Sequence, residues 1–205
     1  MYTDATGKSH RVLGFCDLTE AKTFQELKVS GKLSFEKISC DEVSVSGKCE
    51  GGSIAAQNLK VSGTCNGDSI IAKNFSVSGK VEVNSLTVEQ TLRISGKPQI
   101  DSVTADELII ATRSGFLGDV KCRKIRIFDD TDKIFGKGFA EYLSSSSRVQ
   151  VNNIEADTVA LENCTVEVIR CKDAFINSNC AIEKLFVSGE CKVSANSTVG
   201  ETIRT

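Results

Sequence analysis

Apolar residues recur along the first half of this chain in columns that repeat about every 16 residues. The tripeptide Val-Ser-Gly starts at Val29, Val45, Val61 and Val77, and Ile94-Ser95-Gly96 follows after a slightly longer step. Alignment on these tripeptides gives almost uniformly apolar columns, such as Leu27, Val43, Leu59, Phe75, Leu92 and Leu108. A repeat of nearly fixed length indicates that one structural unit is stacked many times.

Within each repeat the apolar and glycine columns follow one another in sequence steps of 2, 2, 2, 5, 2 and 3. Steps of two are the period of a strand, whereas an amphipathic helix would show steps of three and four. Units of this kind can coil so that each lies directly above the last. We therefore predict an all-β fold: a single-stranded right-handed parallel β-helix (solenoid) with rungs of about 16 residues. The left-handed hexapeptide form would repeat an aliphatic residue every six positions, which these columns do not.

Three further columns refine this prediction. Glycine recurs at Gly31, Gly47, Gly63, Gly79 and Gly96, which indicates a bend where a Cβ atom is disfavoured. Two residues later the column contains Leu33, Cys49, Cys65, Val81 and Pro98, and another aliphatic column contains Ile38, Ile54, Ile70, Leu86 and Val103. The single proline fits a ladder in which nearly every backbone N–H donates a hydrogen bond.

The columns divide the chain into four segments. We expect a flexible N-terminal arm over residues 1–10 and well-registered rungs over 11–128, where Val12, Gly14, Cys16 and Ala21 fit a degraded first rung. The pattern fails over 129–148, which we interpret as an insertion loop or hairpin. Alternation resumes over 149–205, where we expect further, less regular rungs, and Cys164 to Cys180 fit two registers.

Composition and charge exclude several classes of partner and location. The net charge of −2 gives no broad electrostatic reason to bind nucleic acid. An odd number of cysteines, nine, and the lack of a charged start followed by a long apolar run favour a reducing cytoplasm over secretion. No window approaches the roughly 18 apolar residues of a membrane-spanning helix.

The cysteines are the most tempting chemical feature, because Cys164, Cys171, Cys180 and Cys191 crowd the C-terminal part. They contain no Cys-x-x-Cys pair of the kind that zinc sites use. Cys16, Cys49 and Cys65 share a column with Leu and Val, so core packing explains them, and stacked Cys49 and Cys65 would lie near each other. His10 has no nearby carboxylate or cysteine in the sequence, and we interpret it as a solvated residue.

Two charged runs also have simple structural interpretations. Lys121, Arg123, Lys124 and Arg126 surround Cys122 and Ile125, as on a strand whose other face is buried. The run Asp129 to Asp132 lacks the Gly and Glu of a calcium-binding loop, so we interpret it as a solvated turn. No nucleotide-binding or nucleophile motif is present. We therefore predict no enzyme activity, no catalytic, metal or cofactor-binding residue and no cofactor.

The segment from Gly47 to Ala72, GKCEGGSIAAQNLKVSGTCNGDSIIA, resembles the repeat of bactofilins, the bacterial polymer-forming cytoskeletal proteins. The likeness covers about residues 11–128. It implies a right-handed β-helix that polymerises end to end without nucleotide in the cytoplasm, often attached peripherally to the inner membrane. The only apolar cluster near the N-terminus is Val12, Leu13 and Phe15, which argues against membrane attachment here.

A physical argument that does not depend on the resemblance also favours self-association. The terminal rungs of a coil expose unpaired backbone groups above an apolar cross-section. We therefore expect a non-catalytic, bactofilin-like cytoskeletal or scaffold element that assembles through the ends of its β-helix. One alternative is a non-polymerising scaffold that binds a partner protein at the 129–148 insertion. A carbohydrate-active β-helix enzyme is a further alternative, although the short turns leave no obvious place for paired catalytic carboxylates.

Overall fold

The computed structural model describes residues 9–18, 20–129 and 148–205. Every regular element in these ranges is a β-strand. The strands are β1 (Ser9–Leu18), β2 (Lys22–Ala111), β3 (Gly115–Phe128), β4 (Val149–Leu161), β5 (Cys164–Ile176), β6 (Ala181–Val187), β7 (Cys191–Val193) and β8 (Thr198–Arg204).

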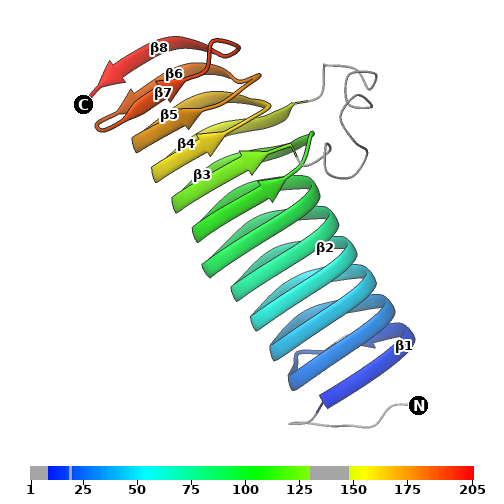
Figure 1. Cartoon of the computed structure of the whole chain (residues 1–205). Coiled ribbons are helices and arrows are strands. Elements are labelled where there is room, and N and C mark those ends of the chain that lie inside the picture. The colour runs from blue at the N-terminus through cyan, green and yellow to red at the C-terminus, as the bar shows by residue number, and fades with distance from the viewer. Residues whose placement is uncertain (1–8, 19, 130–147) are drawn as a thin grey trace, which may run out of the picture.

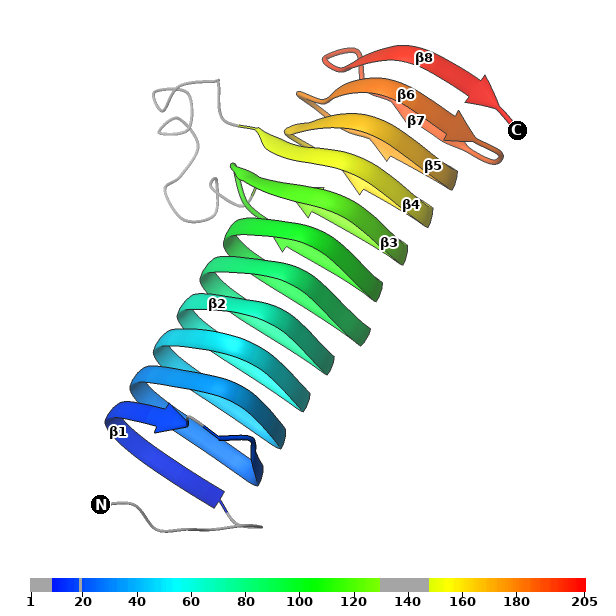
Figure 2. The same ribbon diagram turned by 180° about the vertical axis from the view of Figure 1, so that it is seen from behind.

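These strands form one parallel sheet that coils into a right-handed β-solenoid of about ten turns. The strand order is β1-β2-β3-β4-β5-β6-β8, with β7 paired to β5. The 90 residues of β2 are several consecutive turns whose strand conformation continues around the corners. Figure 1 shows the coil rising from β1 in blue to β8 in red, and Figure 2 shows it from behind. The predicted fold is confirmed.

Successive turns differ slightly in length. The turn from Val12 to its partner Val29 is longer than the turn from Ile154 to its partner Ile169. The one large step leads from Val120 to Ile154, which are directly paired although their separation in sequence is far greater than in any other turn. The stack therefore continues from β3 to β4 across the predicted insertion. Residues 130–147 of that insertion lie outside the described residues.

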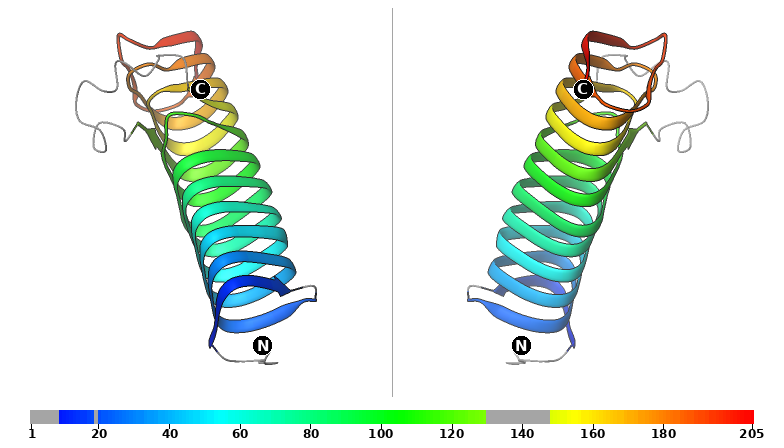
Figure 3. Two further views of the ribbon diagram at one scale, coloured as in Figure 1. Left: turned by 90° about the vertical axis from the view of Figure 1, so that its right-hand side faces the viewer. Right: turned by 90° about the vertical axis from the view of Figure 1, so that its left-hand side faces the viewer.

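Each rung has three sides, and each side turns a pair of residues toward the axis. In the rung that starts at Leu27, the first side buries Leu27 and Val29, the second buries Leu33 and Phe35, and the third buries Ile38 and Cys40. Exposed or half-buried polar residues separate the pairs. Figure 3 shows the rod that results from stacking such rungs. Six inward side chains a rung, at about 1.5–3 kcal/mol for each fully buried aliphatic group, form a linear core.

The inward positions differ from the predicted spacing in two respects. The glycine column is exposed at Gly31, Gly47 and Gly63, so it marks a corner and not a core position. A column that the sequence did not reveal is buried two residues after Leu33, and it contains Phe35, Val83 and Ile100. Gly51 occupies that column above Phe35, and a Cβ atom there would lie 2.0 Å from the carbonyl oxygen of Phe35 and 2.8 Å from its phenyl ring. The backbone and ring of Phe35 thus leave no room for a side chain at position 51.

The glycine corner meets both conditions that were predicted for it. The backbone φ angles lie between +125° and +136° at Gly31, Gly47, Gly63, Gly79 and Gly96. A Cβ atom on each of them would also lie 2.0–2.1 Å from the carbonyl oxygen of the glycine below. In the later rungs the corner uses left-handed asparagines instead, Asn163 at φ 56° and Asn179 at φ 58°. These residues accept that conformation better than most others do.

The first rung is more complete than the sequence indicates. Strand β1 begins at Ser9, so residues 9 and 10 of the predicted arm belong to the first rung, and residues 1–8 lie outside the described residues. Val12, Gly14 and Cys16 pair with Val29, Gly31 and Leu33, as expected. Ala21, however, is exposed, and Phe24 supplies the buried residue of this turn.

Candidate functional site

All nine cysteines lie in inward columns of the solenoid, as packing predicts. One column contains five of them, at Cys16, Cys49, Cys65, Cys164 and Cys180, each with an exposed fraction of 4% or less. Cys40, Cys122 and Cys171 share another column, and Cys191 lies above Ala174. In the described part of the chain, no group of three His, Cys, Asp or Glu side chains could bind a metal ion.

Two pairs of cysteines are stacked in adjacent rungs. A hydrogen bond with Cys65, together with burial, raises the pKa of the Cys49 thiol well above its usual value. A hydrogen bond with Cys180, together with burial, has the same effect on the pKa of Cys164. Both pairs are almost completely shielded from solvent. The expected proximity of Cys49 and Cys65 is therefore observed. In the second pair, a hydrogen bond with Cys164 lowers the pKa of the Cys180 thiol to about 7.

His10 is not a solvated residue of an arm. It lies in β1 and pairs with Leu27 of the next rung, in a column that is otherwise apolar. Its ring stacks on Phe24, with 5.9 Å between the ring centroids and an angle of 27° between the planes. The imidazole therefore covers part of the N-terminal end of the core.

Two of the four basic residues in the β3 run are paired with acidic residues of neighbouring rungs. Arg123 binds Asp106 with two hydrogen bonds of 2.7 and 2.9 Å, and this interaction lowers the pKa of the Asp106 carboxyl. Lys121 forms an ion pair of 3.2 Å with Glu155, and the guanidinium of Arg126 lies 4.8 Å from the ring centroid of Phe128. The run is exposed around buried Ile125, as predicted for a solvent-facing strand.

Only the edges of the predicted insertion are described. Asp129 accepts a hydrogen bond of 2.8 Å from Arg113, and Arg148 donates one of 2.7 Å to Asn179. Both contacts fix the chain to the rod where it leaves and rejoins the stack. Asp130, Thr131 and Asp132 lie outside the described residues.

The two ends of the solenoid are the surfaces with unsatisfied strand edges. Among the residues that the structure describes, strand β1 pairs only with β2, and at the other end β7 pairs only with β5 and β8 only with β6. A Cβ atom on Gly14 would meet nothing within 4 Å, in contrast to the stacked glycines above it. Strand edges of this kind are templates for pairing with another chain.

Inward-facing valines of the first side are less buried at both ends of the described stack than within it. Val193 of β7 follows Ile176 in its column and keeps 43% of its surface exposed, because no rung lies above it among the described residues. Val12 starts the same column at the other end and is half-buried. The sequence alone did not single out Val193, because an inward-facing valine has the same sequence pattern in a terminal rung as in an internal one.

The third side of the last rung is closed by polar groups. Thr202 and Arg204 occupy the positions that Leu185 and Val187 hold one rung below, and both are exposed. Arg204 donates a hydrogen bond of 2.6 Å to the carbonyl oxygen of Gly189. Apolar contact at this end is therefore confined to the first two sides.

Comparison of the chain with protein-family models, with curated proteins and with solved structures found no match. The class that the fold itself defines is the parallel β-solenoid. Within the described ranges, no helix has the length and apolar character to cross a membrane. The bactofilin resemblance rests on the residues of the repeat.

Proposed function

We propose that this chain is a non-catalytic structural protein that assembles end to end through its terminal rungs. The observation that carries the proposal is the exposure of Val193, an inward core residue, beside the open edge of β7. A bactofilin-like cytoskeletal or scaffold role is the form of the proposal that the repeat resemblance favours.

The two ends are geometrically complementary. Strand β7 spans the column positions of Ala174–Ile176 on the first side, and β8 spans positions on the second and third sides. Strand β1 spans the first and second sides at the opposite end. Because every strand runs parallel to its neighbours, a second copy placed above the C-terminal end repeats the rung step of the coil.

The contact we propose therefore stacks Val12 of the next copy on Val193. Parallel pairing of the open edges supplies backbone hydrogen bonds, and the valine contact excludes water beside them. Thr202 and Arg204 limit the apolar area, so we expect reversible assembly that depends on protein concentration.

Sedimentation velocity of the full chain over a range of protein concentrations tests this proposal, with reductant present to prevent disulfide cross-links. The wild-type chain should form species that grow with concentration. Val193→Glu places a charge in the contact and should leave monomers. Ile71→Glu is the matched control, because Ile71 is 52% exposed on a mid-rod face, and it should assemble like the wild type.

Two outcomes would overturn the proposal. One is a wild-type chain that stays monomeric at every concentration. The other is equal assembly of the two variants, which would place the contact away from the C-terminal end.

A further inference from the structure

One outward-facing column on the first side of the rod alternates long basic with short side chains. Each member from Lys28 to Arg93 lies three residues before a glycine of the stacked corner, which fixes the register. From Lys28 to Arg126, every second rung contributes a basic residue, at Lys28, Lys60, Arg93 and Arg126, and Arg11 precedes Lys28 in the first rung. The rungs between them contribute Ser44, Ser76 and Ile109, and Ile109 pairs directly with Arg126.

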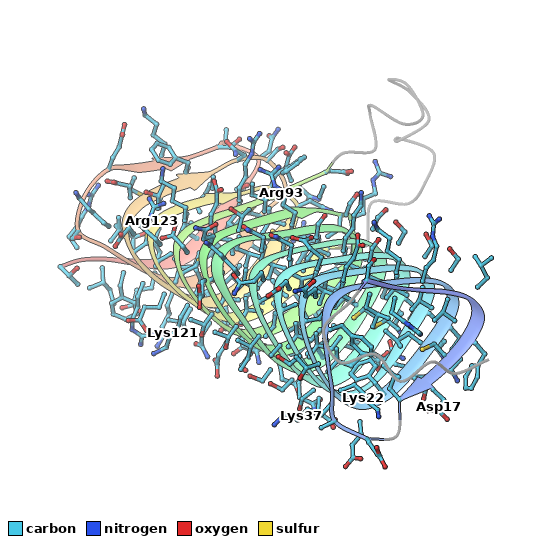
Figure 4. All side chains as sticks on the ribbon, turned by 90° about the horizontal axis from the view of Figure 1, so that it is seen from below. Asp17, Lys22, Lys37, Arg93, Lys121 and Arg123 are labelled. Carbon is cyan, nitrogen blue, oxygen red and sulfur yellow. The ribbon has the colours of Figure 1, made fainter. Side chains whose placement is uncertain are left out.

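A groove of about 580 Å³ lies along this column. Lys28, Lys60 and Arg93 line it on one side, and the small Ser44 and Ser76 leave recesses between them. Figure 4 shows Arg93 projecting outward from the rod, on a different side from Lys37 and Lys121. The groove runs parallel to the axis, so a ligand that fills it must be extended.

The other wall of the groove is a ladder of polar side chains that starts with Glu26 and Glu42 and continues with Asn58, Asn74 and Thr91. Asn58 donates a hydrogen bond of 2.6 Å to Glu42, and Asn74 donates one of 3.0 Å to the side-chain oxygen of Asn58. Each amide nitrogen has two N–H donors and uses one of them in the ladder. Donors spaced at one rung, roughly 5 Å, thus face an extended ligand along the groove.

Two of the four cations contact neither an acidic residue nor an aromatic ring among the described residues. Lys28 is paired with Glu26, and Arg126 packs on Phe128. Lys60 and Arg93 form no ion pair with any residue that the structure describes, and both are exposed. They lie two rungs apart, which places their charges roughly 10 Å from each other along the axis.

We propose that this groove binds an extended anionic polysaccharide that lies along the rod and carries one carboxylate in each disaccharide. In a linear polymer of alternately flipped sugars, equivalent groups face one side once in each disaccharide, and that unit advances by about two rungs. The carboxylates then meet Lys60 and Arg93, while sugar hydroxyls bind the asparagine ladder and the serine recesses. A nucleic acid strand fits less well, since its charges repeat about every 3.4 Å.

Isothermal titration of the full chain with a hyaluronan octasaccharide tests the proposal, because this probe has one carboxylate in each disaccharide. The wild-type chain should bind it, and the affinity should fall with rising salt. The double variant Lys60→Ser, Arg93→Ser should bind at least about tenfold more weakly. Lys37→Ser, Lys97→Ser removes two exposed lysines outside the groove and should change the affinity less than about twofold.

Thermal unfolding of both double variants checks that the rod remains folded, and these surface changes should leave it intact. The proposal fails if the wild-type chain does not bind the octasaccharide at millimolar concentration, or if both double variants lose affinity equally. It also fails if a neutral chitin hexasaccharide or a single-stranded oligonucleotide binds as tightly as hyaluronan.

Discussion

A Cβ atom on Gly79 would lie 2.0 Å from the carbonyl oxygen of Gly63 in the rung below. The same relationship joins Gly47 to Gly31 and Gly63 to Gly47 at 2.1 Å, so the whole corner is a column of backbones in close approach. The close approach of successive rungs at this corner therefore explains why glycine repeats there.

We predict that Gly79→Ala destabilises the protein by about 3 kcal/mol or more, through backbone strain and the clash with Gly63. Gly14→Ala is the matched control, because its φ of 97° carries a similar strain while its Cβ atom would meet no neighbour. Urea unfolding should rank Gly79→Ala as the more damaging change. Equal losses would show that close approach contributes nothing.

Phe75 is the largest of the fully buried side chains and should be a principal support of the core. Phe75→Ala should lower the free energy of unfolding by about 3–5 kcal/mol, because a linear core offers few atoms that can collapse into the cavity. Ile71→Ala, four residues earlier on the outside of the coil, should change it by less than about 0.5 kcal/mol. Chemical denaturation of both variants measures the difference.

The thiols predict a loss of stability at alkaline pH. Burial raises the pKa of Cys122 to about 12, above its usual value of 9.0. The unfolded chain therefore releases the proton first, and stability falls as the pH rises above about 9. Cys122→Ala matches Ala105 and Ala156, its neighbours in the column.

Over pH 9 to 11 this variant should lose about 1–2 kcal/mol less stability than the wild type, with reductant present. Urea unfolding at several pH values provides the measurement. Parallel losses in the two proteins would indicate that the Cys122 thiol ionises as readily in the folded chain.

The columns from Leu27 to Ala111 could be predicted from the sequence because the rungs there keep nearly constant length. The Phe35 column could not, since Gly51 breaks its apolar pattern. Gly51 lies in close approach to the carbonyl oxygen and ring of Phe35 in the adjacent rung, a contact between rungs that the residue types alone do not reveal.

The C-terminal register was ambiguous for a related reason. The corner glycines give way to Asn163 and Asn179, and the turn between Ile154 and Ile169 is shorter than the turns of the first half. The sequence also could not predict how far the side chains at the ends of the rod are buried. Val193 has the character of a core residue, and only the lack of a rung above it in the described chain leaves it exposed.

The charge of a side chain in the sequence predicts less about a binding surface than its position in the stack of rungs does. The basic residues of β3 form a visible cluster because they are close together in the sequence. Asp106 and Glu155 nevertheless neutralise two of them. Lys60 and Arg93 are distant in sequence and line one groove only when the rungs stack.

Cryo-electron microscopy of the wild-type chain at high concentration tests end-to-end assembly most directly. Rods should join along their axes, and the rung spacing of roughly 4.8 Å should continue through each junction, with Val193 of one copy against Val12 of the next. Rods that remain single, or that associate only side by side, would contradict the proposed assembly.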